Sequence, residues 1–238
     1  MNESLSNTQM EKLLDILAEL ETGRPVQYVL GTTEFCNYSF IVNESVLIPR
    51  PETEELVYWI LEDFSNSKDL AVLDACTGSA CIAVSLAKLL RNPQVRALDV
   101  SKAALKLAGE NIALNKCSVK LVEQDLLDKS KWENIEEMDI LISNPPYIRP
   151  SESTLMRKNV LDHEPKLALF APEDDPLIFY KALSEIAAIK LKAGGAIYLE
   201  INEALAEGVK EVFLQKGFSK LLLRRDLNQK DRMIRIQR

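Results

Sequence analysis

The chain has 238 residues, enough for one sizeable α/β domain with a small attachment. Its composition, 47% hydrophobic and 27% charged, is typical of soluble globular proteins, and no apolar run reaches the ~18 residues of a transmembrane helix. We therefore expect no membrane segment. With a net charge of −7 and a pI of about 5.0, the chain has no general electrostatic attraction for polyanions. We therefore expect no direct requirement for a nucleic acid.

The N-terminus begins polar and then turns amphipathic, unlike the basic and then apolar pattern of a signal peptide. The four cysteines, Cys36, Cys76, Cys81 and Cys117, form no CxxC pair, and His163 is the only histidine. These features predict a cytoplasmic protein whose cysteines are reduced fillers, with no metal site and no multi-histidine chemistry.

The first elements are predicted from a change of periodicity near Gly23 and Pro25. Before these residues, leucines at helical spacing predict an amphipathic helix over residues 8–21. After them, aromatic and β-branched residues over 29–42 favour a hairpin with Asn37 in its turn. A further helix is expected to begin at Pro51, because proline suits the first turn of a helix.

From residue 70 onward, strand-like and helix-like runs alternate, which predicts a doubly wound, mostly parallel seven-stranded sheet. The predicted strands span residues 71–74, 95–99, 119–123, 139–143, 196–201, 220–223 and 233–236. The predicted helices span residues 79–90, 103–115, 176–191 and 204–215, with Asp175 and Pro176 expected to cap and begin the third. The stretch 149–174 lacks strong periodicity, and long loops of that kind are usually functional.

The first of these strands leads into a turn of small residues, Cys76-Thr77-Gly78-Ser79-Ala80, and then into a helix. Such a turn lets backbone N–H groups approach a ligand closely, and Asp99 closes the next strand where it can accept hydrogen bonds from ribose hydroxyls. This pattern indicates a nucleoside-containing cofactor. Only Gly78 remains of the three glycines of the strongest form of the motif, so a plain strand–turn–helix connection stays open as the alternative.

Asn144-Pro145-Pro146-Tyr147 follows the fourth predicted strand, where ligands bind in open α/β sheets. An amide or exocyclic amino nitrogen is a poor nucleophile because its lone pair is delocalised. The Asn144 side-chain oxygen and the Pro145 carbonyl could accept its two N–H groups and direct it at a methyl carbon. Tyr147 offers a flat face for the planar group. The alternative is a rigid Pro-Pro turn with a capping asparagine.

This tetrapeptide resembles the catalytic motif of class I methyltransferases that act on planar nitrogens. Two upstream blocks are more specific, Pro-Val-Gln-Tyr-Val-Leu-Gly at 25–31 and Leu-Ile-Pro-Arg-Pro-Glu-Thr-Glu at 47–54. Together with Glu34-Phe35, they resemble the HemK/PrmC family of protein-(glutamine-N5) methyltransferases. These enzymes modify the glutamine of the Gly-Gly-Gln motif in peptide chain release factors. Further likeness lies in Glu164-Pro165, Leu167-Ala168-Leu169-Phe170 and Tyr180, so the resemblance runs from about Gly23 to the C-terminus.

The resemblance implies a class I, Rossmann-like α/β enzyme that uses S-adenosylmethionine, yields S-adenosylhomocysteine and acts on a release factor. Nothing in the sequence demands assembly, so we expect a monomer. It assigns the methionine part of the cofactor to Cys76, Thr77, Gly78, Ser79 and Ala80, its ribose to Asp99, and its adenine to the neighbourhood of Leu126. It assigns the substrate glutamine to Asn144, Pro145, Pro146 and Tyr147. Asn144 would also touch the cofactor, and Asn144, Pro145 and Tyr147 would be catalytic.

Other acidic and basic residues receive less specific expectations. Asp125 is either a cofactor neighbour or a solvated loop acid. Glu200, at the end of its predicted strand, is interpreted as structural, and Arg50 is expected to anchor the loop around it.

The resemblance also implies a domain division. Residues 1–24 would be a truncated N-terminal helical segment, 25–65 a hairpin and linker helix, and 66–238 the methyltransferase catalytic domain. The family carries a longer helical domain before the 25–31 block, so we expect substrate recognition to be weakened, simplified or supplied elsewhere. The methyl group of Ala80, where a close approach is expected, would lower cofactor affinity by a modest factor.

Two other functions are compatible with parts of the pattern. A nucleic-acid amino-methyltransferase acting on adenine N6 or guanine N2 faces the same planar nitrogen, but the acidic composition and the 47–54 block disfavour it. A catalytically weakened paralogue would explain the short N-terminus and the glycine-poor turn, but the intact tetrapeptide at Asn144 disfavours that reading.

Overall fold

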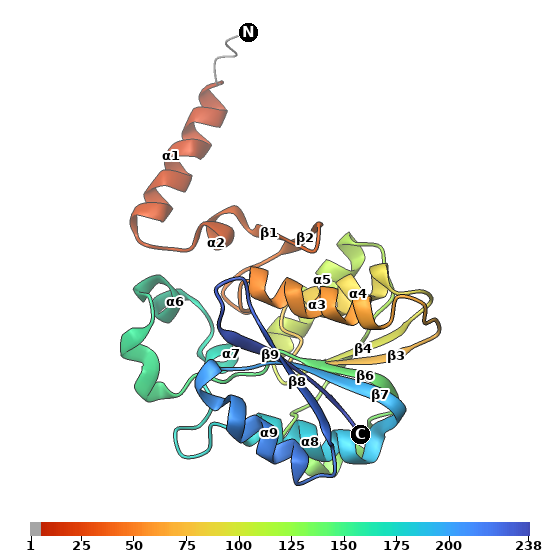
Figure 1. Ribbon diagram of the computed structural model, residues 1–238. Helices are drawn as coiled ribbons and strands as arrows, with labels where there is room; N and C mark the ends of the chain where they lie inside the picture. The colour runs from red at the N-terminus through yellow and green to blue at the C-terminus, as the bar shows by residue number, and fades with distance from the viewer. Residues whose placement is uncertain (1–5) are drawn as a thin grey trace.

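A twisted seven-stranded sheet forms the centre of the molecule in the computed structural model, which describes residues 6–238 (Figure 1). Residues 1–5 of the predicted N-terminal segment lie outside the described residues. The strands are β3 (Ala71–Ala75), β4 (Gln94–Asp99), β5 (Lys120–Glu123), β6 (Met138–Ser143), β7 (Leu191–Glu200), β8 (Lys220–Arg225) and β9 (Asp231–Gln237). Their order in the sheet is β5-β4-β3-β6-β7-β9-β8.

The sheet is mostly parallel, as the sequence predicts. Strands β3 to β7 pair in parallel, whereas β9 runs antiparallel between β7 and β8. The predicted fold class is therefore confirmed, including the number of strands. The largest difference in a strand boundary is at β7, which begins at Leu191, ahead of its predicted start, and pairs with Met138 before the register shifts.

Helices cover both faces of the sheet, and each face has its own apolar core (Figure 1). One layer holds α3 (Pro51–Asp63), α4 (Cys81–Leu89) and α5 (Lys102–Leu114), and the other holds α8 (Ile178–Lys190) and α9 (Ala206–Leu214). Trp59 and Leu86 are fully buried in the first core, and Leu183 and Phe213 in the second. This three-layer arrangement explains why the central strands read as continuous apolar runs.

The predicted cap of α8 is wrong. Its N-cap residue is Leu177, and no side chain caps this end. The Asp175 carboxylate instead pairs with Lys181 at 2.7 Å, while the Asp175 carbonyl accepts the N–H of Ile178 at 3.1 Å. Asp175 therefore serves a preceding turn and the helix flank.

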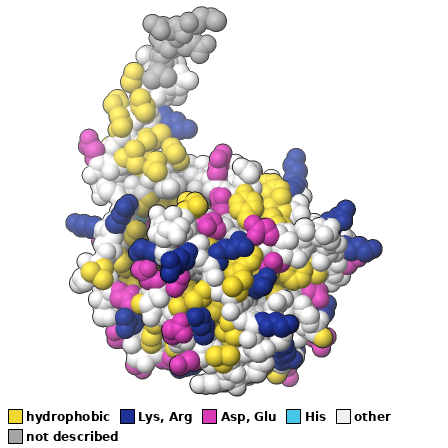
Figure 2. All heavy atoms as spheres, viewed as in Figure 1, with side chains coloured by type: hydrophobic (Ala, Val, Ile, Leu, Met, Phe, Trp, Pro, Cys, Tyr) yellow, Lys and Arg dark blue, Asp and Glu magenta, His cyan; other side chains and the backbone are white. Residues whose placement is uncertain are grey.

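The N-terminal elements are α1 (Asn7–Glu21), α2 (Val26–Leu30) and a hairpin of β1 (Thr32–Phe35) and β2 (Tyr38–Ile41). The hairpin packs on α5, where Asn111 accepts the Ile41 N–H at 2.6 Å and donates to the Ile41 carbonyl at 3.0 Å. By contrast, α1 extends away from the body and has no buried residue (Figure 1). Figure 2 shows apolar side chains gathered along it, among them Met10, Leu13, Leu14 and Leu17.

The stretch predicted to lack periodicity contains three short helices, η2 (Pro150–Leu155), α6 (Lys158–His163) and α7 (Lys166–Leu169). Each is too short to show a helical repeat in sequence. Along the whole described chain, 6–238, no helix combines the length and apolarity needed to cross a membrane.

Candidate active site

A cavity of about 270 Å³ opens at the carboxyl ends of the parallel strands. It lies beside β3 and β6, where the strand order reverses and where ligands bind in folds of this type. Eight residues predicted for the site line it: Cys76, Thr77, Gly78, Ser79, Asp99, Leu126, Asn144 and Pro146. Ala80, Pro145 and Tyr147, also predicted for the site, do not line this cavity.

The turn after β3 keeps a backbone suited to glycine although it contains only one. Cys76, Gly78 and Ala80 have φ of 60°, 55° and 61°, all in the left-handed region. For a residue with a side chain this conformation costs roughly 1–2 kcal/mol. Ala80 is fully buried in the core beneath α4, so its methyl group belongs to the core packing and not to the cavity wall.

Asp99 ends β4 and faces the same cavity. Its Oδ2 accepts the Gly78 N–H and its Oδ1 accepts the Ser101 N–H, both at 2.9 Å. Burial raises the pKa of this carboxyl, and the backbone hydrogen bonds oppose the shift. The carboxylate therefore braces the turn through Gly78 and keeps lone pairs for a ligand hydroxyl.

Asp74 lies beneath the turn, fully buried on β3. Its Oδ2 accepts the hydroxyl of Thr77 at 2.5 Å, while Oδ1 has no hydrogen-bond partner among the described residues. Burial raises the pKa of Asp74 to about 7, against the effect of the Thr77 hydrogen bond. Nearby, burial also raises the pKa of the Cys76 thiol, which keeps it neutral.

Leu98, Val100 and Leu126 supply an apolar part of the cavity wall. The backbone at Leu126 is held in place because its carbonyl accepts the indole N–H of Trp132 at 2.9 Å. Asp125, the residue left open by the sequence, also lines the cavity, and its Oδ1 accepts the N–H of Leu127 at 2.8 Å.

Asn144 follows β6 and presents its side chain at the cavity. Its Nδ2 lies 3.3 Å from Oγ1 of Thr53 in the first turn of α3. The hydroxyl of Tyr147 donates to Oε1 of Glu200 at 3.0 Å, and burial is the main cause of the raised pKa of Tyr147. Tyr147 thus packs beside the core on the α8 face.

The sequence did not single out Thr53, and it assigned Glu200 only a structural role. Thr53 falls within the 47–54 block without a predicted role of its own, yet it lines the cavity and donates to Oε2 of Glu200 at 2.6 Å. Burial raises the pKa of Glu200, while Thr53, Tyr147 and the charge of Arg232 lower it. The only sign of Thr53 in the sequence is its place in the 47–54 block. That this block forms part of the site depends on long-range contacts, which the sequence does not show.

Two segments close the cavity from outside the sheet, one around Val46–Arg50 and one around Pro165–Ala168. They are joined by Glu164, whose Oε1 lies 2.5 Å from the Arg50 guanidinium and whose Oε2 accepts the Ile48 N–H at 3.4 Å. Arg50 therefore lies where the sequence placed it, as an anchor of its loop.

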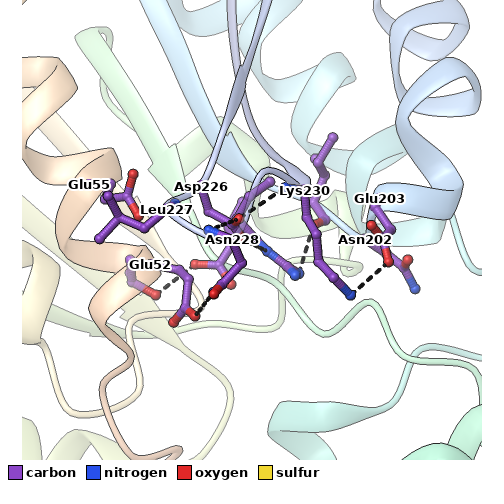
Figure 3. Close-up of polar contacts among 12 residues, drawn as sticks. Glu52, Glu55, Asn202, Glu203, Asp226, Leu227, Asn228 and Lys230 are labelled. Carbon is purple, nitrogen blue, oxygen red and sulfur yellow. Dashed lines mark hydrogen bonds and ion pairs between the residues drawn. The ribbon is translucent and has the colours of Figure 1, made fainter.

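The turn between β8 and β9 lies against the start of α3 (Figure 3). The N–H of Leu227 donates to Glu55 at 3.2 Å, and the Asn228 side chain donates to Glu52 at 3.3 Å. On the other side, Lys230 pairs with Glu203 at 3.1 Å. The contacts with Glu52 and Glu55 hold the helix turn that carries Thr53.

Known proteins resemble this chain over most of its length. Residues 57–166 match the family model "Methyltransferase small domain". The chain is 43% identical to "Release factor glutamine methyltransferase" of Flavobacterium psychrophilum, over 98% of this chain and 82% of that protein. It is 41% identical to the protein of the same name from Lactococcus lactis, over 100% of this chain and 86% of that protein.

A solved structure of a methyltransferase from Pyrococcus furiosus superposes with a TM-score of 0.60 at 19% identity, covering 97% of this chain and 98% of that one. At this identity the match demonstrates the shared fold alone.

Proposed function

Because the chain belongs to the release factor glutamine methyltransferase family, we propose that it methylates the side-chain amide nitrogen of the glutamine in the Gly-Gly-Gln motif of a peptide chain release factor. The methyl donor in this proposal is S-adenosylmethionine. The observation that carries the proposal is the position of Asn144, at the wall of a cavity shared with Asp99 and the turn after β3.

The donor set in the cavity fits S-adenosylmethionine. Asp99 offers carboxylate lone pairs for the ribose hydroxyls, and the wall around Leu126 offers apolar contact for adenine. The turn at Cys76 to Ser79 provides backbone groups and small side chains for the methionine part. When bound, S-adenosylmethionine supplies an electrophilic methyl carbon. Binding and orienting the substrate amide are left to the protein.

The protein must make a weakly nucleophilic amide nitrogen react. In the proposed mechanism Asn144 Oδ1 and the Pro145 carbonyl accept the two N–H groups of the substrate amide. They would orient the nitrogen toward the methyl group and stabilise the positive charge that develops on it, until the nitrogen loses one of its protons to solvent and S-adenosylhomocysteine leaves. Pro146, at the cavity wall, bounds the space for the planar group, while Tyr147 holds the loop through its hydrogen bond to Glu200.

The proposed partner is a release factor, on which we expect the protein to act as a monomer. The acidic composition suits a protein substrate better than a polyanion. A cytoplasmic location, where translation termination takes place, is part of the same proposal.

Mass spectrometry of a recombinant release factor, incubated with this protein and S-adenosylmethionine, tests the proposal. We expect the Gly-Gly-Gln glutamine to gain the mass of one methyl substitution, and a release factor with alanine at that glutamine to gain none. Methylation of RNA or DNA in place of the release factor would instead establish a nucleic-acid amino-methyltransferase. No methylation of any of them, with cofactor binding intact, would indicate a weakened paralogue.

A further inference from the structure

A continuous chain of hydrogen bonds runs from the buried end of β7 to the cavity, with Glu200 at its centre. Only 2% of Glu200 is exposed. Its Oε2 accepts the Thr53 hydroxyl at 2.6 Å, and its Oε1 accepts the Tyr147 hydroxyl at 3.0 Å. The Nδ2 of Asn144 lies 3.3 Å from the same Thr53 oxygen. This series of hydrogen bonds thus joins α3, β7 and the loop after β6.

The chemistry of these groups allows only one order of donors and acceptors along the series of hydrogen bonds. Both carboxyl oxygens of Glu200 accept hydroxyl protons, Oε1 from Tyr147 and Oε2 from Thr53, so the single hydroxyl proton of Thr53 is committed to Glu200. The Thr53 oxygen can then only accept from Asn144, which must offer its amino group. This leaves Oδ1 of Asn144 directed away from Thr53, free to accept a hydrogen bond in the cavity.

A flipped Asn144 would do the opposite. Its amino group would meet the N–H groups of a substrate amide, so two donors would face each other and the nitrogen would not be bound. An asparagine amide has nearly the same shape in both orientations, so sterics alone do not choose between them. The choice must come from the hydrogen-bond partner.

We propose that Thr53 and Glu200 are positioning residues that hold Asn144 with its oxygen toward the substrate nitrogen. This inference rests on the proposed function only in requiring a substrate that donates an N–H group. Thr53 and Glu200 act through Asn144; neither needs to touch the reacting atoms.

The surroundings keep this arrangement rigid. The Tyr180 hydroxyl donates to the Glu200 carbonyl at 3.1 Å, which fixes the end of β7. Arg232 on β9, itself bonded to Asp226 at 3.2 Å, contributes positive charge near Glu200. The contacts of Glu52 and Glu55 with the β8–β9 turn hold the helix residues on either side of Thr53 (Figure 3).

Thr53→Val and Thr53→Ser form the matched pair for the test. Valine keeps the shape and removes the hydroxyl, whereas serine keeps the hydroxyl and removes the methyl group. We expect Thr53→Val to lower kcat about tenfold, the effect of one lost hydrogen bond, with little change in cofactor affinity. Thr53→Ser should restore most of the rate. An unchanged kcat in Thr53→Val, an equal loss in both variants, or a parallel loss of cofactor affinity would each overturn the proposal.

Glu200→Gln provides a second test, since a glutamine can offer either its oxygen or its amino group to Thr53. We expect kcat to fall in the wild-type background and to fall clearly less in the Thr53→Val background, because part of the effect passes through Thr53. Equal losses of kcat in the two backgrounds would contradict the proposal that Glu200 acts on Asn144 through Thr53.

A readout without turnover separates this inference from the proposed function. The side-chain amide signals of Asn144 can be assigned by NMR in ¹⁵N-labelled protein through their loss in Asn144→Ala. Thr53→Val should shift them and speed their exchange with water, while Thr53→Ser should not. Unshifted signals would refute the positioning role of Thr53 even if the release factor is methylated. A shift without release factor methylation would refute only the substrate.

Discussion

Asn144 and Asp99 face the same cavity but are expected to serve different parts of the reaction, so their effects should separate. We predict that Asn144→Ala lowers kcat at least about a hundredfold, as for loss of one group that stabilises developing charge, and leaves cofactor affinity nearly unchanged. We predict that Asp99→Ala weakens cofactor affinity about tenfold or more with a smaller effect on kcat at saturation. Calorimetry and single-turnover rates measure the two effects. A near-wild-type rate for Asn144→Ala would refute its role.

Ala80 and Ala83 are both fully buried, yet only Ala80 has a positive φ. Ala80→Gly relieves backbone strain of roughly 1–2 kcal/mol, which offsets the lost methyl contacts and the greater chain entropy. We therefore predict a change in the free energy of unfolding below about 1 kcal/mol. Ala83→Gly, inside α4, relieves no strain and should cost about 1–2 kcal/mol. Denaturant unfolding compares the two, and equal losses would contradict this account.

Asp74 should make stability depend on pH. Its pKa of about 7 in the folded protein lies above the ordinary value of 3.8, so the folded state binds more protons between these values. The free energy of unfolding should fall as pH rises through this range, by up to about 1.4 kcal/mol per pH unit, and then level off. The Asp74→Asn variant cannot ionise at this position, so its free energy of unfolding should rise relative to that of the wild type between pH ~5 and ~8. Parallel pH curves for the two proteins would exclude Asp74 as the cause.

Among the elements, the segment around α6 and α7 depends on few contacts with the body. Glu164 joins it to Arg50 and Ile48, and the backbone of Ile148 pairs with Leu169 and Ala171. We predict that Glu164→Ala speeds amide hydrogen exchange in 158–169 and weakens cofactor binding, because Pro165 and Ala168 line the cavity. Exchange in β3 should be unchanged and serves as the control. Protection of 158–169 equal to the wild type would show that the backbone pairing suffices.

The elements themselves could be predicted because helix and strand periodicities are local properties of the chain. The turn after β3 and the tetrapeptide at Asn144 are likewise contiguous, so their approach at the ends of neighbouring strands followed from the fold class. The contact of Thr53 with Glu200 spans 147 positions, and that of Arg50 with Glu164 spans 114. No local pattern encodes such pairings, since they arise only when α3 and the segment after β6 pack beside the sheet.

Conformation was harder to predict than position. The methyl group of Ala80 is buried in the core, which no local pattern shows, and its modest effect on cofactor affinity stays a prediction. The start of α8 was misplaced because Asp175 and Pro176 satisfy the sequence preference for a cap, while the helix begins after Leu177. At the start of α8, packing overrode a local preference.

At the scale of the whole molecule, α1 lies outside the two cores. Leu17 on α1 is 47% exposed, whereas Leu56 on α3 is fully buried. We predict that Leu17→Ala changes the free energy of unfolding by less than about 0.5 kcal/mol, and that Leu56→Ala lowers it by about 2–5 kcal/mol. Thermal or denaturant unfolding distinguishes them. A comparable loss in both variants would mean that α1 packs on the body in solution.

The position of β9 has a consequence for how the protein is made. This strand comes last along the chain, yet it lies inside the sheet, between β7 and β8. Until it has been synthesised, β7 and β8 have no neighbour to pair with on that side, and Arg232 is missing beside Glu200. The sheet, and with it the buried end of β7, can therefore be completed only after β9 has left the ribosome.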